Sequence, residues 1–193
     1  MNIYKLPTLV IVAGVEWHIK TDFRDVIDVL ENLNNPELDE EEKRLYALIR
    51  LVDDFDSLSP DDYTECLQAL FDFISVKTDD APATVEKKKK EYKLMDWAQD
   101  GYYLISAVNK VAGVDVRTLD YLHWWTFMSY YMEIDSKSLY ATILHIRRKK
   151  KEGKAMETWE RTFYAENKDL IDLREPMTQE ELEEEKLVNE LFG

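Results

Sequence analysis

The side chains of this sequence whose types could do chemistry are three histidines, one cysteine and a run of carboxylates. His18, His123 and His145 each lack a second histidine or cysteine at the spacing that a zinc site needs. Cys66 lies among apolar neighbours on a predicted helix, a setting that suppresses the reactivity of a thiol. We therefore interpret His123, which precedes two tryptophans, as a hydrogen-bonded core residue, and we find no candidate nucleophile.

The acidic stretch DDFDSLSPDDYTE has the outline of a calcium-binding loop. Positions one, three, nine and twelve of such a loop would be Asp54, Asp56, Asp62 and Glu65. However, Leu58 stands at position five, and Ser59 stands at position six, where the sharp turn needs glycine. We interpret the stretch as the solvated start of a helix.

Motifs for other chemistry are missing from the sequence. It contains no phosphate loop, dinucleotide fingerprint or serine elbow. Paired carboxylates are frequent, but in a chain with 40 acidic residues they arise by chance. We expect a protein that is not an enzyme and that uses no metal or cofactor.

The charge of the chain restricts its partners. A formal net charge of −15 argues against general nucleic-acid binding, which requires an excess of lysine and arginine. Two basic runs, Lys87–Lys90 and Arg147–Lys151, can contact nucleic acid or an acidic partner, although we favour solvated charge. One cysteine, no signal-peptide pattern and no bilayer-length apolar run lead us to expect a cytoplasmic protein without membrane contact.

The N-terminal part, 1–75, is expected to hold a β-hairpin and three helices. Apolar residues alternate from Leu9 to Ile19 around Gly14, which predicts two short strands. Because an isolated hairpin is marginal in water, it must lie on the helices that follow or on another copy of the protein. Capping residues and helical periodicity predict helices over 22–33, 39–52 and 59–74, the second with an apolar stripe of Leu45, Leu48, Ile49 and Val52.

Residues 76–92 are expected to be a flexible linker, and 93–174 a C-terminal helical part. The linker loses apolar periodicity and contains Pro82. In the C-terminal part, one helix starts near Trp97 and ends at Gly113. A later helix is expected to begin at Ser136 and to end in the basic run. The chain is thus expected to be mainly α, a multi-helix domain with a short N-terminal β-hairpin.

Between these helices, LDYLHWWTFMSYYMEI (119–134) concentrates aromatic rings. Such a run can form an aromatic cage, a stacking platform for bases, a membrane-surface helix or a core helix. With Thr118 as its cap, a helix here would place Tyr121, Trp125, Met128 and Met132 on one face and Trp124, Phe127 and Tyr131 on the next. We favour a core helix packed on two sides and expect Trp125→Ala to cost about 3–5 kcal/mol. The predicted core comprises Trp97, Leu104, Trp124, Trp125, Phe127, Met128 and Tyr131.

The C-terminal segment, 175–193, predicts a short acidic helix. Thr178 and Glu181 can form a capping box. The apolar residues of the segment fall on one narrow stripe, which makes them candidate partner-binding residues: Leu187, Val188, Leu191 and Phe192.

Several segments together resemble a known family. They are MNIYKLP at the start, Gly14-Val15-Glu16, TDFRD (21–25), YLHWWTF (121–127), RRKKKEGK (147–154) and FYAENKDLIDL (163–173). In this order they are similar to the bacteriophage gp-fifteen family of tailed phages and prophages of Gram-positive bacteria. The His-Trp-Trp motif is the most specific of them.

The resemblance implies a role in building the phage tail. Genes of the family typically lie near the tape-measure gene, which implies a tail-assembly chaperone that binds the tape-measure protein and tail-tube subunits in the host bacterial cytoplasm. A helical domain can mask the apolar faces of a partner's helices, and the hairpin can mediate self-association through its strand edges. The alternative function is a structural or adaptor component retained in the tail.

Overall fold

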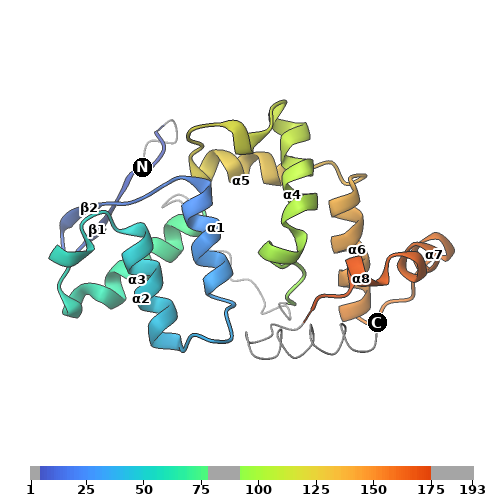
Figure 1. Ribbon diagram of the computed structural model, residues 1–193, viewed down its shortest axis with the longest axis horizontal. Helices are drawn as coiled ribbons and strands as arrows, with labels where there is room; N and C mark the ends of the chain where they lie inside the picture. Colours follow the sequence, from blue (N-terminus) through green and yellow to red (C-terminus); the bar gives the residue numbers. More distant parts are fainter. Residues whose placement is uncertain (1–4, 78–91, 175–193) are drawn as a thin grey trace, which may run out of the picture. The chain divides into compact units, whose positions relative to one another are not determined.

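The computed structural model describes residues 5–77 and 92–174. Within them the chain forms eight α-helices and one two-stranded antiparallel sheet, so the predicted mainly α fold with an N-terminal hairpin is confirmed (Figure 1). The fold divides into two compact units, Pro7–Phe71 and Asp72–Leu173. Each unit has its own core.

The first unit opens with the hairpin of β1 (Leu9–Val12) and β2 (Val15–His18). Ala13 and Gly14 link the strands with φ angles of 49° and 78°. Positive φ at both positions is what a two-residue hairpin turn of type I′ requires, and glycine adopts it at little cost. One face of the hairpin is packed inward through Val10 and Val12, which are 8% and 1% exposed.

Two helices follow, and both begin at predicted caps. The Asp22 carboxylate caps α1 (Phe23–Asn32), and Asp39 forms a capping box with Glu42 at the start of α2 (Glu40–Leu51). Figure 1 shows α2 running back along α1, with which it is in contact. The core side of α2 consists of Ala47, Leu48 and Leu51.

After α2 the chain makes two short 3₁₀ turns before its next helix. These are η1 (Phe55–Ser57) and η2 (Pro60–Asp62), and α3 (Tyr63–Ile74) follows directly. The hydroxyl of Ser59 accepts a hydrogen bond from the main-chain N–H of Asp61, as expected of a cap before Pro60. The last three residues of α3 belong to the second unit.

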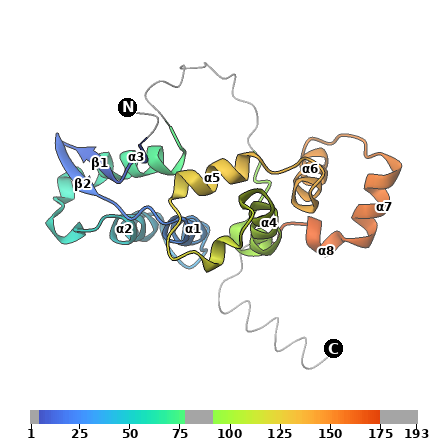
Figure 2. The ribbon, with the colours of Figure 1, turned by 90° about the horizontal axis from the view of Figure 1, so that it is seen from above.

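The second unit is helical. It contains α4 (Trp97–Ala112), η3 (Val116–Thr118), α5 (Trp124–Met132), α6 (Leu139–Lys151), α7 (Thr158–Glu166) and α8 (Lys168–Ile171). The longest helix, α4, contacts α5 and α6, and α8 packs on α6. Figure 2 shows how α7 and α8 double back, so that α8 returns toward α4 and α6. Gly113, with a φ of 70°, ends α4 as predicted.

Two predicted helix starts are wrong. Thr118 caps no helix, because its hydroxyl donates to the carbonyl oxygen of Asp115 and closes η3 instead; α5 begins only at Trp124. The cap of α6 is Ser138 rather than Ser136, since the Ser138 hydroxyl accepts the main-chain N–H of Ala141.

Two predicted apolar faces also differ from the structure. Leu45 and Ile49 of α2 are 41% and 52% exposed, because the buried stripe of this helix is centred on Leu48 and Leu51. In the aromatic segment, Tyr121 precedes the helix and is 54% exposed, and Met132 at its end is 64% exposed. Both residues lie before or at the end of this nine-residue helix, so its apolar face is shorter than predicted.

Most of the predicted linker and the predicted C-terminal helix, with Leu187, Val188, Leu191 and Phe192, lie outside the described residues, as does Lys87–Lys90. Within the described ranges, every helix is too short or too polar to cross a bilayer.

Candidate functional site

The His-Trp-Trp motif lies where two helix ends meet. The imidazole Nδ1 of His123 accepts the main-chain N–H of Trp125 at 3.0 Å, which makes the histidine the cap of α5. The indole N–H groups of Trp124 and Trp125 donate to the carbonyl oxygens of Ile74 and Phe73, both at 2.8 Å. These carbonyls belong to the last turn of α3, where carbonyl oxygens have no partner within the helix; that of Phe73 also accepts the main-chain N–H of Val76 at 3.1 Å. The motif therefore terminates one helix and starts another.

Burial separates the two tryptophans. Trp124 is 1% exposed and stacks on Phe127 with ring centroids 5.7 Å apart, whereas Trp125 is half-buried against Phe73. Of the other predicted core residues, Leu104 and Phe127 are buried and Trp97, Met128 and Tyr131 are half-buried. His123, 3% exposed, is the hydrogen-bonded core residue that we predicted.

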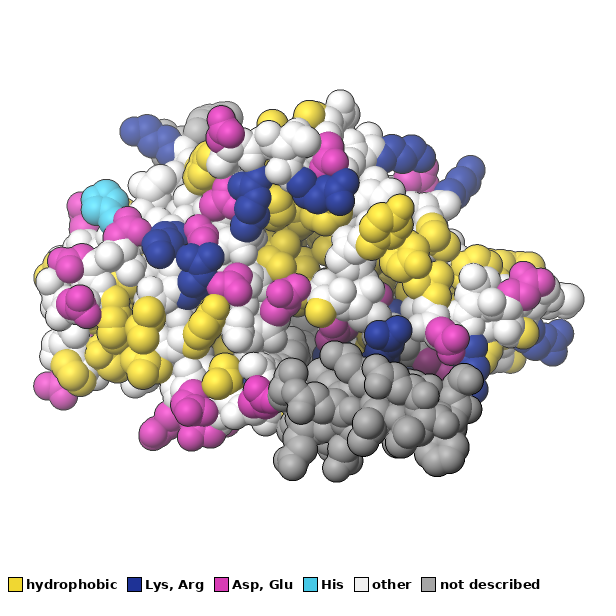
Figure 3. Space-filling model, in the orientation of Figure 1, with side chains coloured by type: hydrophobic (Ala, Val, Ile, Leu, Met, Phe, Trp, Pro, Cys, Tyr) yellow, Lys and Arg dark blue, Asp and Glu magenta, His cyan; other side chains and the backbone are white. Residues whose placement is uncertain are grey.

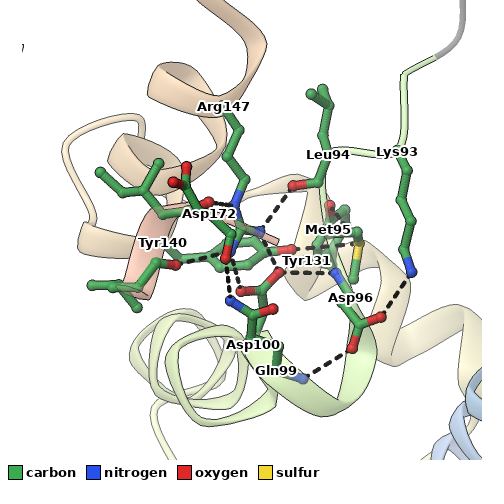
Figure 4. Close-up of polar contacts among 12 residues, drawn as sticks. Lys93, Leu94, Met95, Asp96, Gln99, Asp100, Tyr131, Tyr140, Arg147 and Asp172 are labelled. Atoms are coloured by element: carbon green, nitrogen blue, oxygen red, sulfur yellow. Dashed lines mark hydrogen bonds and ion pairs between the residues drawn. The ribbon is translucent and has the colours of Figure 1, made fainter. Parts of the chain in front are cut away.

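A second polar centre surrounds the guanidinium of Arg147 on α6. The side chain is 3% exposed and forms a bidentate ion pair with Asp100 of α4, at 2.5 and 2.8 Å (Figure 4). Its remaining N–H groups donate to three main-chain carbonyl oxygens, those of Leu94, Leu170 and Ile171. All five donors of the guanidinium are thus used, as the burial of a charge requires. We call this set of residues the arginine centre.

The arginine centre joins segments that are distant in sequence. It connects α6 and α4 to the stretch before α4 and to α8, whose Leu170 and Ile171 lie 70 and 71 residues after Asp100. Tyr140 extends it, donating a hydrogen bond to the Met95 sulfur at 3.5 Å (Figure 4). Burial raises the pKa of Tyr140 well above its ordinary value, so the phenol stays protonated.

A third polar cluster is built around Glu160 of α7, which is 1% exposed. Its carboxylate accepts hydrogen bonds from Lys149, at 2.6 and 2.8 Å, and from the main-chain N–H of Glu157, and it lies 2.7 Å from Nε2 of His145. The hydrogen bonds from Lys149 are the main reason that the pKa of Glu160 is lowered from 4.5 to about 2. The cluster fixes α7 to α6.

The basic run of α6 is not simply solvated charge, so that interpretation is wrong for Arg147. Lys149 is bound to Glu160, and Lys150 pairs with Asp172 while lying 4.1 Å from the ring centroid of Tyr164. The run thus serves mainly to tie α7 and α8 to α6. The spacing of these residues indicates buried charges that the sequence analysis did not identify. Arg147 lies four residues after the buried Ile143 and Asp100 lies four before the buried Leu104, so each charge is on the apolar face of its helix.

The remaining predicted candidates are placed as follows. Cys66 is fully buried, and burial, assisted by the charge of Asp62, raises its pKa to about 11. Glu65 accepts the main-chain N–H of Ala13 at 3.0 Å and thereby ties α3 to the hairpin turn. Across residues 5–77 and 92–174, no group of three or more histidines, cysteines or carboxylates is arranged to hold a metal ion.

Fold and site define a class of protein: a mainly α chain with a short hairpin, in which motif residues join helix ends and a buried arginine connects four segments. The family model described as Bacteriophage Gp15 protein matches residues 3–173, so the chain belongs to this family and is a phage-related protein. The resemblance inferred from segments such as YLHWWTF is confirmed. No curated protein and no solved structure matches the chain.

Proposed function

We propose that this phage protein is a tail-assembly chaperone that binds the tape-measure protein and tail-tube subunits in the host bacterial cytoplasm, without catalysing a reaction. One observation carries the proposal beyond family membership. Two aliphatic side chains on α2, Leu45 and Ile49, lie one helical turn apart and are 41% and 52% exposed. Such a pair offers the apolar anchor points that an amphipathic partner helix uses.

Other apolar side chains at the surface support the same kind of binding. In the second unit, Tyr102, Met132, Leu139 and Trp159 are 46% to 75% exposed. Figure 3 shows hydrophobic side chains reaching the surface over α2 and α3, on the left, with acidic side chains between them. Acidic neighbours would keep a complex soluble while apolar side chains cover the partner.

The use of the motif residues inside the protein also favours a binding role. The three residues of the His-Trp-Trp motif, 123–125, form hydrogen bonds at helix ends. All five N–H groups of the Arg147 guanidinium donate to groups of the same chain. These residues preserve the shape that presents the surface. They are positioned to hold helices, with no partner molecule required.

Co-expression with the tape-measure protein of the same phage tests the proposal. We expect wild-type protein to keep the tape measure soluble and to co-purify with it, and the double variant Leu45→Glu, Ile49→Glu to lose both effects. The matched control is Glu41→Gln, Arg44→Gln, which alters exposed polar residues of the same helix. An insoluble tape measure beside wild-type protein contradicts the proposal.

The rival role is a structural or adaptor component of the tail. Mass spectrometry of purified virions separates the two, since a chaperone is released during assembly. A chain present in virions at a fixed ratio to the tail-tube protein would favour the rival.

A further inference from the structure

The outer edge of β2 offers main-chain hydrogen-bonding groups. The main-chain N–H of Ile19 donates to the carbonyl oxygen of Thr8 at 3.1 Å, and the strand register pairs Val10 with Trp17 and Val12 with Val15. Hydrogen-bonded pairs alternate along an antiparallel ladder. The main-chain groups of Val15 and Trp17 therefore face β1, and those of Glu16 and His18 face the opposite, outer edge.

A short third segment covers only part of this edge. The main-chain N–H of Asp53 donates to the carbonyl oxygen of His18 at 3.1 Å, and that of Lys20 donates to Leu51 at 2.8 Å. Ile19 and Val52 complete the antiparallel bridge. The segment stops because the next residues turn into η1, so no strand in the described part of the chain lies opposite Glu16.

A hollow of about 370 Å³ lies where the third segment stops. It is lined by Val15, Glu16, Trp17, His18, Asp53 and Asp54. This volume falls in the range of small ligand sites, and here it adjoins a strand edge. An extended peptide placed in it would continue, along β2, the antiparallel pairing that Val52 and Asp53 make with Ile19 and His18.

The chemistry of the lining selects the occupant. Three exposed carboxylates, those of Glu16, Asp53 and Asp54, line the hollow together with the half-buried Trp17. A lysine or arginine would pair with the carboxylates and lie on the indole face. The whole unit has the same sign, with 16 acidic and 5 basic residues in 7–71.

We propose that the outer edge of β2 binds an extended, basic peptide segment of a partner protein by strand addition. The partner segment pairs its main chain with Glu16 and places lysine or arginine side chains against Trp17, Asp53 and Asp54. A second copy of this chain fits less well, because two units each carrying 11 excess negative charges repel one another. This inference uses a different surface from α2 and stands apart from the chaperone proposal.

The test uses labelled peptides that alternate lysine with valine, with peptides that alternate glutamate with valine as a comparison. Fluorescence anisotropy with the full chain should show binding of the basic peptide only. Glu16→Pro removes the outward N–H and leaves the β1 ladder intact, since this N–H does not face β1. We expect about tenfold weaker binding, the loss of one hydrogen bond to the peptide. Glu16→Gln, which keeps the N–H, should retain more affinity than the proline variant.

A second variant tests the same edge in case Glu16→Pro does not fold. Asp53→Lys, Asp54→Lys reverses two charges at the hollow and should weaken the basic peptide by more than tenfold at low salt while raising affinity for the acidic peptide. Thermal melting of each variant checks the fold. Equal binding of both peptides, or binding unchanged in both variants, overturns the proposal. A dimer of the chain that Glu16→Pro abolishes would assign the edge to a second copy and overturn it as well.

Discussion

The two tryptophans of the His-Trp-Trp motif are expected to contribute unequally to stability. The indole of Trp124 is 1% exposed and bonds the carbonyl oxygen of Ile74, whereas that of Trp125 is only half-buried. We expect Trp124→Ala to cost about 3–5 kcal/mol of the free energy of unfolding through the cavity it leaves. Trp125→Ala should cost less, and urea denaturation of both variants provides the comparison. Equal losses would show that exposure does not distinguish the two rings.

The arginine centre should respond unequally to single and double substitutions. Arg147→Met leaves the Asp100 carboxylate buried without its cation, which we expect to cost about 3–5 kcal/mol. Asp100→Leu likewise leaves the Arg147 guanidinium buried without its counter-charge, which should also lower the free energy of unfolding. The double variant should lose less than the sum of the two, because it removes both charges together. Additive losses in a denaturation cycle would contradict the coupling.

Glu160 predicts a pH dependence of stability. Its pKa of about 2 in the folded protein lies below the ordinary value of 4.5, so the unfolded chain binds the proton first as pH falls. The stabilisation is fully present above pH 4.5 and is lost as pH falls toward 2. Wild-type protein should therefore lose more stability between pH 5 and pH 3 than Glu160→Gln does. Glu166→Gln, at an exposed position of the same helix, is the control and should behave like wild type.

At the scale of elements, the start of α5 depends on a histidine cap. His123→Ala removes the acceptor of the Trp125 N–H and should cost about 0.5–2 kcal/mol. Asparagine at this position also caps helices well, so His123→Asn should recover part of the loss. Thermal denaturation of the three proteins tests the cap. If asparagine recovers nothing, ring packing against Phe73 rather than capping accounts for the histidine.

The sequence predicts elements better than it predicts their faces. Caps with a local mechanism, such as Asp22, Asp39 and Gly113, lie where the residue types indicate. Thr118 is not a cap, because it closes η3 with a hydrogen bond to Asp115 and α5 begins only at Trp124. Local pattern cannot decide between such neighbours.

The partners of the buried charged residues could not be predicted from the sequence. Glu160 lies 11 residues after Lys149, and Asp100 lies 47 before Arg147, so neither pairing follows from helical spacing. A charge on an apolar face indicates that a partner exists. Only the packing of α4 on α6 and of α7 and α8 around them identifies it.

At the scale of the whole molecule, charge is divided between the units. Residues 7–71 carry 16 acidic and 5 basic side chains, whereas the described part of Asp72–Leu173 carries 13 of each. The first unit also contains the exposed pair on α2 and the open edge of β2. Acidic charge beside apolar and main-chain binding groups suits a partner that is poorly soluble by itself.

One measurement tests the central claim, that this chain works by covering apolar surface of the tape-measure protein. Purified tape-measure protein is diluted from denaturant, and its aggregation is followed by light scattering with increasing amounts of the chain. We predict that stoichiometric amounts suppress the scattering without any added nucleotide or metal ion, and that the Leu45→Glu, Ile49→Glu variant does not. Aggregation that proceeds at the same rate with and without the wild-type chain would contradict the account.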